Sequence, residues 1–257
     1  MTPITVVKLG GSTLGRHDTS LDDIAAFHRE GRRLVVVHGG GATISAWLDK
    51  HGVQSRFVRG LRATDAAALE VVVAVLAGLV NKQLVAELQA RGARATGLSG
   101  ADGALIRARR YDPELGFVGE ITGVDADSLS AMAEHVVIVL APIAVEADGG
   151  ELHPQLLNLN ADTAAGEAAA ALGAERLVFL TDVPGVLDAA GKVQARIGPK
   201  QAQELLADGA IAGGMIPKVE AGLRAAMAGV QTIVVDGREA GALRAVLAGK
   251  QTGTRIG

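Results

Sequence analysis

The chain has 257 residues, of which 49% are apolar and only six are aromatic, and its formal net charge is −3. The scarcity of aromatic rings and of excess positive charge argues against a nucleic-acid-binding surface. The absence of cysteine excludes disulfides, iron–sulfur clusters, thiolate zinc sites and a cysteine nucleophile.

Short apolar runs alternate with longer alanine-rich stretches along the chain. The predicted buried strands are Ile4–Leu9, Leu34–His38, Ala93–Leu98, Val136–Ala141, Leu177–Thr181 and Thr232–Val235. The predicted helices are Asp22–Glu30, Ala42–Lys50, Asp65–Arg91, Asp125–Ala133, Ala161–Leu172, Pro199–Ala207, Lys218–Ala228 and Ala240–Ala248. This alternation is typical of parallel βαβ units and predicts an α/β fold, a three-layer αβα sandwich with a largely parallel central sheet.

Two segments interrupt the alternation, Leu105–Ile121 and Val145–Leu157, and their Asp, Gly and Pro residues predict β-hairpins at the rim. A predicted helix ends and a strand begins near Leu172–Glu175, which divides the chain into two lobes, 1–172 and 173–257. The longest wholly apolar run, Val136–Val145, is too short to cross a bilayer, and no signal peptide precedes the first strand. We therefore expect a cytoplasmic protein with no membrane partner.

Glycine turns follow the first two predicted strands. Gly10 and Gly11 come after Lys8, and Gly39, Gly40 and Gly41 open directly into a predicted helix. Adjacent glycines allow close backbone approach, and the N–H groups of a helix N-terminus attract anions. One such turn is most simply a tight βα connection, whereas two favour an anion site. Neither turn has the pattern of a P-loop or of a dinucleotide-binding fingerprint.

Charged and amide side chains lie close to the other predicted turns. Lys8 ends an apolar strand and Lys218 opens a helix, where its charge opposes the helix dipole unless an anion is bound. Asn158, Asn160 and Asp162 precede or open another helix, either as caps or as ligand-binding groups. Arg62 is either a surface arginine or a clamp for a carboxylate.

Eight short motifs occur in one order along almost the whole chain. The sequence thereby resembles the amino acid kinase family, on these segments: Lys8-Leu9-Gly10-Gly11, His38-Gly39-Gly40-Gly41, Gly60-Leu61-Arg62, Asn81-Lys82, Gly97-Leu98-Ser99-Gly100, Asn158-Leu159-Asn160-Ala161-Asp162, Thr181-Asp182-Val183-Pro184-Gly185-Val186 and Gly214-Met215-Ile216-Pro217-Lys218. The closest branch of that family phosphorylates the side-chain carboxylate of N-acetyl-L-glutamate with ATP, in the second step of arginine biosynthesis.

The resemblance implies a set of roles for the matching residues. The expected catalytic residues are Lys8, Lys218 and Asp162, with the aspartate orienting the two lysines. The expected substrate-binding residues are Gly40, Gly41, Arg62, Asn158 and Asn160. The residues expected to bind phosphate or ATP are Gly10, Gly11, Gly39, Thr181, Asp182 and Met215. Magnesium is expected to be held mainly by ATP, so no direct protein ligand for a metal is predicted.

The same resemblance implies a homodimer formed through the N-terminal lobe. Because the first strand is predicted at Ile4, we expect no additional N-terminal helix of the kind that arginine-inhibited hexamers use, and therefore a dimer insensitive to arginine. Alternative interpretations are a kinase for carrier-protein-linked aminoadipate in lysine biosynthesis and a non-catalytic sensor of ATP or an amino acid. Aspartokinase and a dehydrogenase fit less well, because no regulatory domain and no dinucleotide fingerprint are present.

Overall fold

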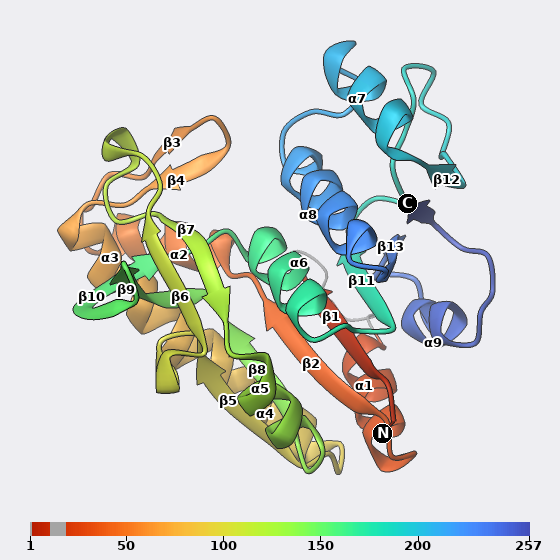
Figure 1. Ribbon diagram of the computed structural model, residues 1–257, viewed down its shortest axis with the longest axis horizontal. Helices are drawn as coiled ribbons and strands as arrows, with labels where there is room; N and C mark the ends of the chain where they lie inside the picture. Colours follow the sequence, from red (N-terminus) through yellow and green to blue (C-terminus); the bar gives the residue numbers. More distant parts are fainter. Residues whose placement is uncertain (1, 11–18) are drawn as a thin grey trace.

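A computed structural model describes residues 2–10 and 19–257 (Figure 1). Its central sheet contains eight described strands in the order β12-β14-β13-β11-β1-β2-β8-β5. Their bounds are β1 (Ile4–Leu9), β2 (Arg33–His38), β5 (Ala95–Ser99), β8 (Val137–Ala141), β11 (Arg176–Thr181), β12 (Arg196–Ile197), β13 (Gln231–Asp236) and β14 (Thr254–Ile256). The six predicted strands are confirmed to within two residues at each end, and they pair in parallel; β14 alone runs antiparallel to its neighbour β13 among the described strands of this sheet.

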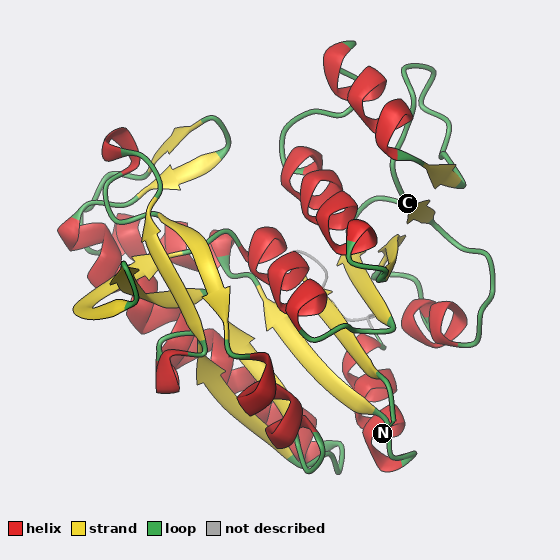
Figure 2. Ribbon diagram, viewed as in Figure 1, coloured by secondary structure: helices red, strands yellow, loops and turns green. Residues whose placement is uncertain are grey.

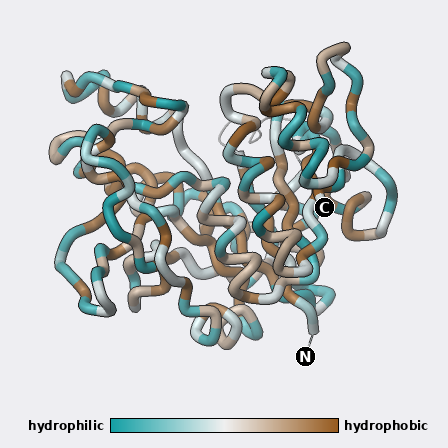
Figure 3. Tube along the Cα trace, turned by 45° about the horizontal axis from the view of Figure 1, so that its top comes forward, coloured by the Kyte–Doolittle hydropathy of each residue, from teal (hydrophilic) through white to brown (hydrophobic). Residues whose placement is uncertain are grey.

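Helices cover both faces of this sheet, as expected of a three-layer sandwich (Figure 2). One face packs on α1 (Ser20–Arg29), α4 (Asn81–Ala90) and α9 (Ala242–Leu247). The other packs on α5 (Ala126–Ala133), α6 (Ala161–Ala171) and α8 (Met215–Met227). Successive strand residues point to opposite faces, so Val6 and Val7 belong to different cores. Figure 3 shows hydrophobic segments concentrated in the interior and hydrophilic segments in the outer loops.

The two interrupting segments form a second sheet, of order β10-β9-β6-β7. Both predicted hairpins are confirmed: β6 (Ile106–Arg110) pairs with β7 (Gly119–Val124), and β9 (Ile143–Asp148) pairs with β10 (Glu151–Asn158). A parallel contact between β6 and β9 joins them. The short 3₁₀-helix η2 (Asp102–Ala104) lies before β6, and the short 3₁₀-helix η3 (Pro113–Leu115) lies between β6 and β7.

A third hairpin, which the sequence analysis did not predict, pairs β3 (Arg56–Val58) with β4 (Leu61–Ala63). Its two-residue turn places Arg59 and Gly60 at positive φ, +51° and +79°, which is the geometry of a tight type I′ turn. This hairpin extends from the N-terminal half of the molecule beside α2 (Gly41–Lys50) and carries Arg62 on its second strand (Figure 1).

The predicted helix at 65–91 is continuous but changes type along its length. It consists of α3 (Ala66–Val73), a π-helical segment η1 (Ala74–Val80) and α4. By length and composition the 25 residues Ala66–Ala90 are apolar enough to cross a membrane, and only 39% of their most hydrophobic window is buried in the single chain. One face packs on the core through Leu69, Val72 and Leu76.

Three predicted helices begin two or three residues from the observed start, and one of them is α1, which begins at Ser20 rather than Asp22. Helix α8 begins at Met215 rather than Lys218, because Pro217 is tolerated in a first turn, where its missing N–H has no intrahelical partner. Helix α9 begins at Ala242, after Gly241 at a φ of +74°. Helix α7 (Pro199–Ala207) agrees with its predicted bounds.

Candidate functional site

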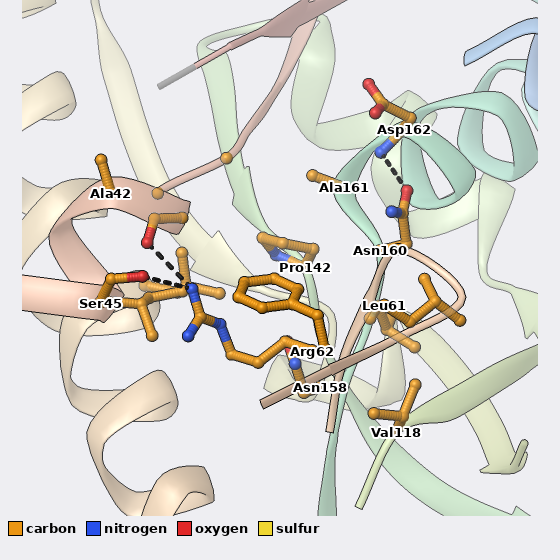
Figure 4. A pocket seen from close by; sticks show the side chains of 18 of the residues that line it. Ala42, Ser45, Leu61, Arg62, Val118, Pro142, Asn158, Asn160, Ala161 and Asp162 are labelled. Carbon is orange, nitrogen blue, oxygen red and sulfur yellow. Dashed lines mark hydrogen bonds between the residues drawn. The ribbon is translucent and has the colours of Figure 1, made fainter. Parts of the chain in front are cut away.

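A pocket of about 360 Å³ lies where β1 and β2 end and where helices α2 and α6 begin. The carboxyl ends of parallel strands are the usual ligand-binding edge of an open α/β sheet. Eight of the predicted site residues line this pocket together, namely Lys8, Gly39, Gly40, Gly41, Arg62, Asn158, Asn160 and Asp162 (Figure 4). The fold thus brings residues up to 154 positions apart into one site.

Two lysines share one buried aspartate at the edge of the pocket. The Lys8 ammonium lies 2.9 Å from Asp162 Oδ1, and the Lys218 ammonium lies 3.1 Å from Asp162 Oδ2. Lys218 also donates to the Gly214 carbonyl, 3.0 Å away. Three charges in a row, +1, −1 and +1, leave a net positive charge, so the cluster suits an anion whose negative charge increases during a reaction.

Helix α6 positions this aspartate. Asn160 caps the helix, its Oδ1 accepting hydrogen bonds from the backbone N–H groups of Asp162 and Thr163 at 2.9 and 3.0 Å. The helix also packs closely on α8, because a Cβ at Gly166 would lie 2.8 Å from the Ala221 Cβ, a distance that only glycine avoids. The close packing holds Asp162 between the lysine of β1 and the lysine of α8.

The glycine turn after β2 supplies backbone donors. Gly39 N–H donates to the Leu9 carbonyl at 3.0 Å, which fastens the turn to β1. Gly40 precedes the first residue of α2, and a Cβ there would lie 2.7 Å from the Leu76 Cδ2. Glycine therefore lets the helix N-terminus sit against the long apolar helix, with its free N–H groups at the pocket.

Arg62 provides positive charge at the other end of the pocket. It is 9% exposed, donates to the Ser45 hydroxyl at 2.8 Å and to the Gly41 carbonyl at 3.1 Å, and also donates to the Ser55 hydroxyl. Its guanidinium lies 4.6 Å from the centre of the Phe57 ring (Figure 4). Burial lowers the pKa of Arg62, yet an arginine remains charged. No carboxylate forms an ion pair with it among residues 2–10 and 19–257, so the position suits the carboxylate of a ligand.

Asn158 connects the pocket to the hairpin that carries Arg62. Its Nδ2 donates to the Thr64 hydroxyl at 3.1 Å, and that hydroxyl donates to the Arg62 carbonyl at 2.9 Å. Thr64 is fully buried. These hydrogen bonds fix the position of Asn158 relative to Arg62, although the two residues lie on different sheets.

The other predicted site residues that the structure describes do not line this pocket. Lys218 contacts it through Asp162, and Gly10 N–H donates to the Leu180 carbonyl at 3.3 Å. Thr181 ends β11 and its hydroxyl donates to Asp182 at 3.3 Å, while Met215 begins α8. Gly11 lies outside the described residues.

Sequence reasoning missed the residues that surround Arg62, namely Ser45, Ser55 and Phe57. The first two are common surface residue types and carry no pattern. For Phe57 there was a signal, because Arg59-Gly60 can form a two-residue hairpin turn, and the resulting register places Phe57 opposite Arg62.

Fold and site together define a class of protein: an αβα sandwich whose pocket, between a buried arginine and a lysine–aspartate–lysine cluster, has the charges that suit a small anionic molecule. The chain belongs to the amino acid kinase family, whose model matches residues 3–236.

Relatives of known name and solved structures agree with this membership. The chain is 45% identical over 239 residues to the acetylglutamate kinase of Dehalococcoides mccartyi, covering 91% of this chain and 87% of that protein. It is 45% identical over 240 residues to the acetylglutamate kinase of Ruegeria pomeroyi, covering 91% and 82%.

Among solved structures, smu.665 from Streptococcus mutans superposes with a TM-score of 0.85 at 30% identity, covering 100% of this chain and 99% of that one. The N-acetylglutamate synthase of Neisseria gonorrhoeae, at 24% identity and a TM-score of 0.83, shares the fold; this chain covers 59% of its length.

Proposed function

We propose that this protein is an ATP-dependent kinase that transfers the γ-phosphoryl group to the side-chain carboxylate of N-acetyl-L-glutamate. The products are N-acetylglutamyl 5-phosphate and ADP, and the reaction is the second step of arginine biosynthesis in the cytoplasm. The observation that carries the proposal is the Lys8–Asp162–Lys218 cluster beside a pocket with a buried arginine, in a chain 45% identical to proteins named acetylglutamate kinase. Neither the carrier-linked substrate nor the sensor is favoured by these relatives.

Arg62 fixes the orientation of the acidic substrate. Its guanidinium is already held by two hydroxyls, a carbonyl and an aromatic face, so little side-chain entropy is lost on binding. An α-carboxylate paired with it would direct the side-chain carboxylate toward the other end of the pocket, where the lysines lie. Asn158, Asn160, Gly40 and Gly41 complete the walls around the substrate.

The transfer itself needs alignment and charge stabilisation, and it needs no general base. A carboxylate is ionised near neutral pH and attacks phosphorus directly. Lys8 and Lys218 stabilise the negative charge on the phosphoryl oxygens, and Asp162 keeps both ammonium groups in place. Backbone N–H groups of Gly40 and Gly41 add hydrogen bonds to the same oxygens, and the family resemblance assigns Gly11 the same role.

The nucleotide is assigned to the C-terminal lobe, residues 173–257, with Thr181, Asp182 and Met215 around it and with Gly10 and Gly39 near its phosphates. Magnesium accompanies ATP and neutralises phosphate charge. Both oxygens of Asp162 already face ammonium groups, which suits a metal ligated by phosphate oxygens and water rather than by this carboxylate. Residues 1–172 are assigned to the acidic substrate and to dimerisation.

A homodimer insensitive to arginine is part of the proposal. What supports a dimer is the apolar helix Ala66–Ala90, of whose most hydrophobic window only 39% is buried within the single chain. A second copy of the same helix is a chemically matched partner for the part left uncovered.

The proposal is tested by trapping the acyl phosphate with hydroxylamine. Purified protein, ATP and Mg²⁺ are incubated with N-acetyl-L-glutamate and, in parallel, with L-glutamate, L-aspartate and N-acetyl-L-aspartate, and the hydroxamate is measured. We expect strong preference for N-acetyl-L-glutamate. Turnover of another acid with none of this substrate would overturn the assignment. Lys218→Ala protein is the matched control for contaminating kinases.

A further inference from the structure

A buried chain of hydrogen bonds lies behind the glycine turn, outside the pocket. Asn81 is fully buried, and its Nδ2 donates to the Val139 carbonyl at 2.9 Å and to the Leu98 carbonyl at 3.3 Å, and lies 3.2 Å from His38 Nε2. Its Oδ1 accepts from the Lys82 ammonium at 3.0 Å, and Lys82 also donates to the Gly97 carbonyl at 2.8 Å. Two of the motifs in the sequence, Asn81-Lys82 and the one that starts at Gly97, meet here without touching the pocket.

The hydrogen bonds of Lys82 and Asn81 determine which ring nitrogen of His38 carries the hydrogen. This ring is 1% exposed; burial, with Lys8 and Lys82 nearby, lowers its pKa from 6.5 to about 4, so the ring is neutral at pH 7. The Lys82 ammonium can only donate, which makes the Asn81 atom facing it the oxygen and the atom facing His38 the nitrogen. His38 Nε2 therefore accepts, and the single ring hydrogen is on Nδ1, which donates to the Gly39 carbonyl at 2.9 Å.

That hydrogen bond determines where the next N–H points. The described chain has no cis peptide bonds, and in a trans peptide the carbonyl and the following N–H point in opposite directions. With the Gly39 carbonyl held by His38, the Gly40 N–H faces away from the imidazole. Gly40 lines the pocket, and its N–H has no acceptor within residues 2–10 and 19–257.

Other parts of the chain are shaped around Asn81. A Cβ at Gly97 would lie 2.0 Å from Asn81 Oδ1, so only glycine fits beneath the amide. The π-helical segment Ala74–Val80 ends immediately before Asn81. A π turn contains about one residue more than an α turn, which rotates the following residues by about 100° around the helix axis. Without that rotation Asn81 would not keep its present position toward the sheet.

We propose that His38 and Asn81 are positioning residues, which hold the Gly39–Gly40 peptide so that the Gly40 N–H is directed at the transferring phosphoryl group. This rests on the proposed function, since it assigns the N–H to that reaction. A flexible glycine turn alone has many conformations, and a fixed donor is far more effective at a charge that develops during reaction. Lys82 contributes by fixing the orientation of the Asn81 amide.

The test compares two substitutions at His38. In His38→Asn the side-chain amide nitrogen can occupy the place of Nδ1 and still donate to Gly39, whereas His38→Leu has similar bulk and no donor. Loss of a whole oxyanion donor costs about 10²- to 10³-fold in kcat, and a misdirected donor costs less. We expect kcat to fall about 10- to 100-fold in His38→Leu and at most about threefold in His38→Asn, with KM for both substrates nearly unchanged.

Val35→Ala is the control for a purely structural effect. Val35 is fully buried on the same strand, points to the side of the sheet opposite His38 and pairs with Val6, so its truncation lowers Tm without affecting the turn. We expect its kcat to be normal at a temperature where all variants are folded. Equal kcat in His38→Leu and wild type, or an equal fall in His38→Asn and His38→Leu, would overturn the proposal. If His38→Leu does not fold, a large fall in kcat in His38→Asn would overturn it alone.

The failure of this proposal is distinguishable from failure of the proposed function. The comparison among variants uses whichever acid the wild-type protein phosphorylates fastest. An incorrect substrate assignment would therefore appear in the wild-type protein, and an incorrect role for His38 would appear only in the ratios between variants.

Discussion

The buried neutral imidazole of His38 makes the stability of the protein depend on acid in a calculable way. In the folded protein its pKa is about 4, and in the unfolded chain it returns to about 6.5. Between these values the unfolded chain binds a proton that the folded protein does not, so stability falls as pH falls. Relative to pH 7, this one group lowers the free energy of unfolding by about 2 kcal/mol at pH 5 and by about 3 kcal/mol once the pH is below 4.

The assay is urea unfolding at pH 7, 6 and 5, for the wild-type protein and for His38→Asn. Burial also lowers the pKa of His28, so acid destabilises both proteins, and only the difference between them isolates His38. We expect wild-type protein to lose about 2 kcal/mol more than His38→Asn between pH 7 and pH 5. Parallel losses in the two proteins would show that His38 titrates normally in the folded state and would refute the reasoning.

Three further substitutions probe the site and its support. Asp162→Asn leaves two buried ammonium groups without their anion. We expect the free energy of unfolding to fall by about 3 kcal/mol or more and kcat to fall at least about 100-fold. A normal Tm in thermal unfolding would contradict the expected loss of stability. Arg62→Ala should raise KM for the acidic substrate about 30- to 100-fold, with a smaller change in kcat, and Arg62→Lys should leave KM almost as high. An unchanged KM would show that Arg62 does not bind the substrate carboxylate. Gly97→Ala should displace Asn81 and lower both Tm and kcat, whereas alanine at Gly198, which has open space around it, should leave kcat unchanged. A normal kcat in Gly97→Ala would show that this network does not act on the turn.

Most of the fold follows from apolar runs. Strands such as Val35–Val37 are buried on both faces by helices, which produces the uninterrupted Val and Leu segments that the sequence shows. The last two strands at one end of the sheet, β12 and β14, have two and three residues and so leave no pattern to find. The β3–β4 hairpin was missed because Phe57 is 57% exposed and no apolar residue of either strand is buried, so the segment lacks a buried apolar face.

The residues of the candidate site fall into the same two groups: those that a sequence pattern predicts and those that depend on packing. Lys8 and the Gly39–Gly41 turn could be placed together because parallel strands end at one edge, and Asp162 because its helix follows another connection at that edge. The serines around Arg62 and the contact between His38 and Asn81 could not be predicted, since both depend on packing between segments far apart in sequence. The π-helical segment before Asn81 likewise has no composition that separates it from an α-helix.

In the proposed reaction the side-chain carboxylate of N-acetyl-L-glutamate attacks phosphorus. This step is tested most directly with substrate labelled by ¹⁸O in that carboxylate, followed by ³¹P NMR of the reaction with ATP and Mg²⁺. We expect an acyl phosphate whose phosphorus resonance carries the isotope shift of a bridging ¹⁸O. ATP converted to ADP with unlabelled inorganic phosphate as the only new phosphorus species would contradict it.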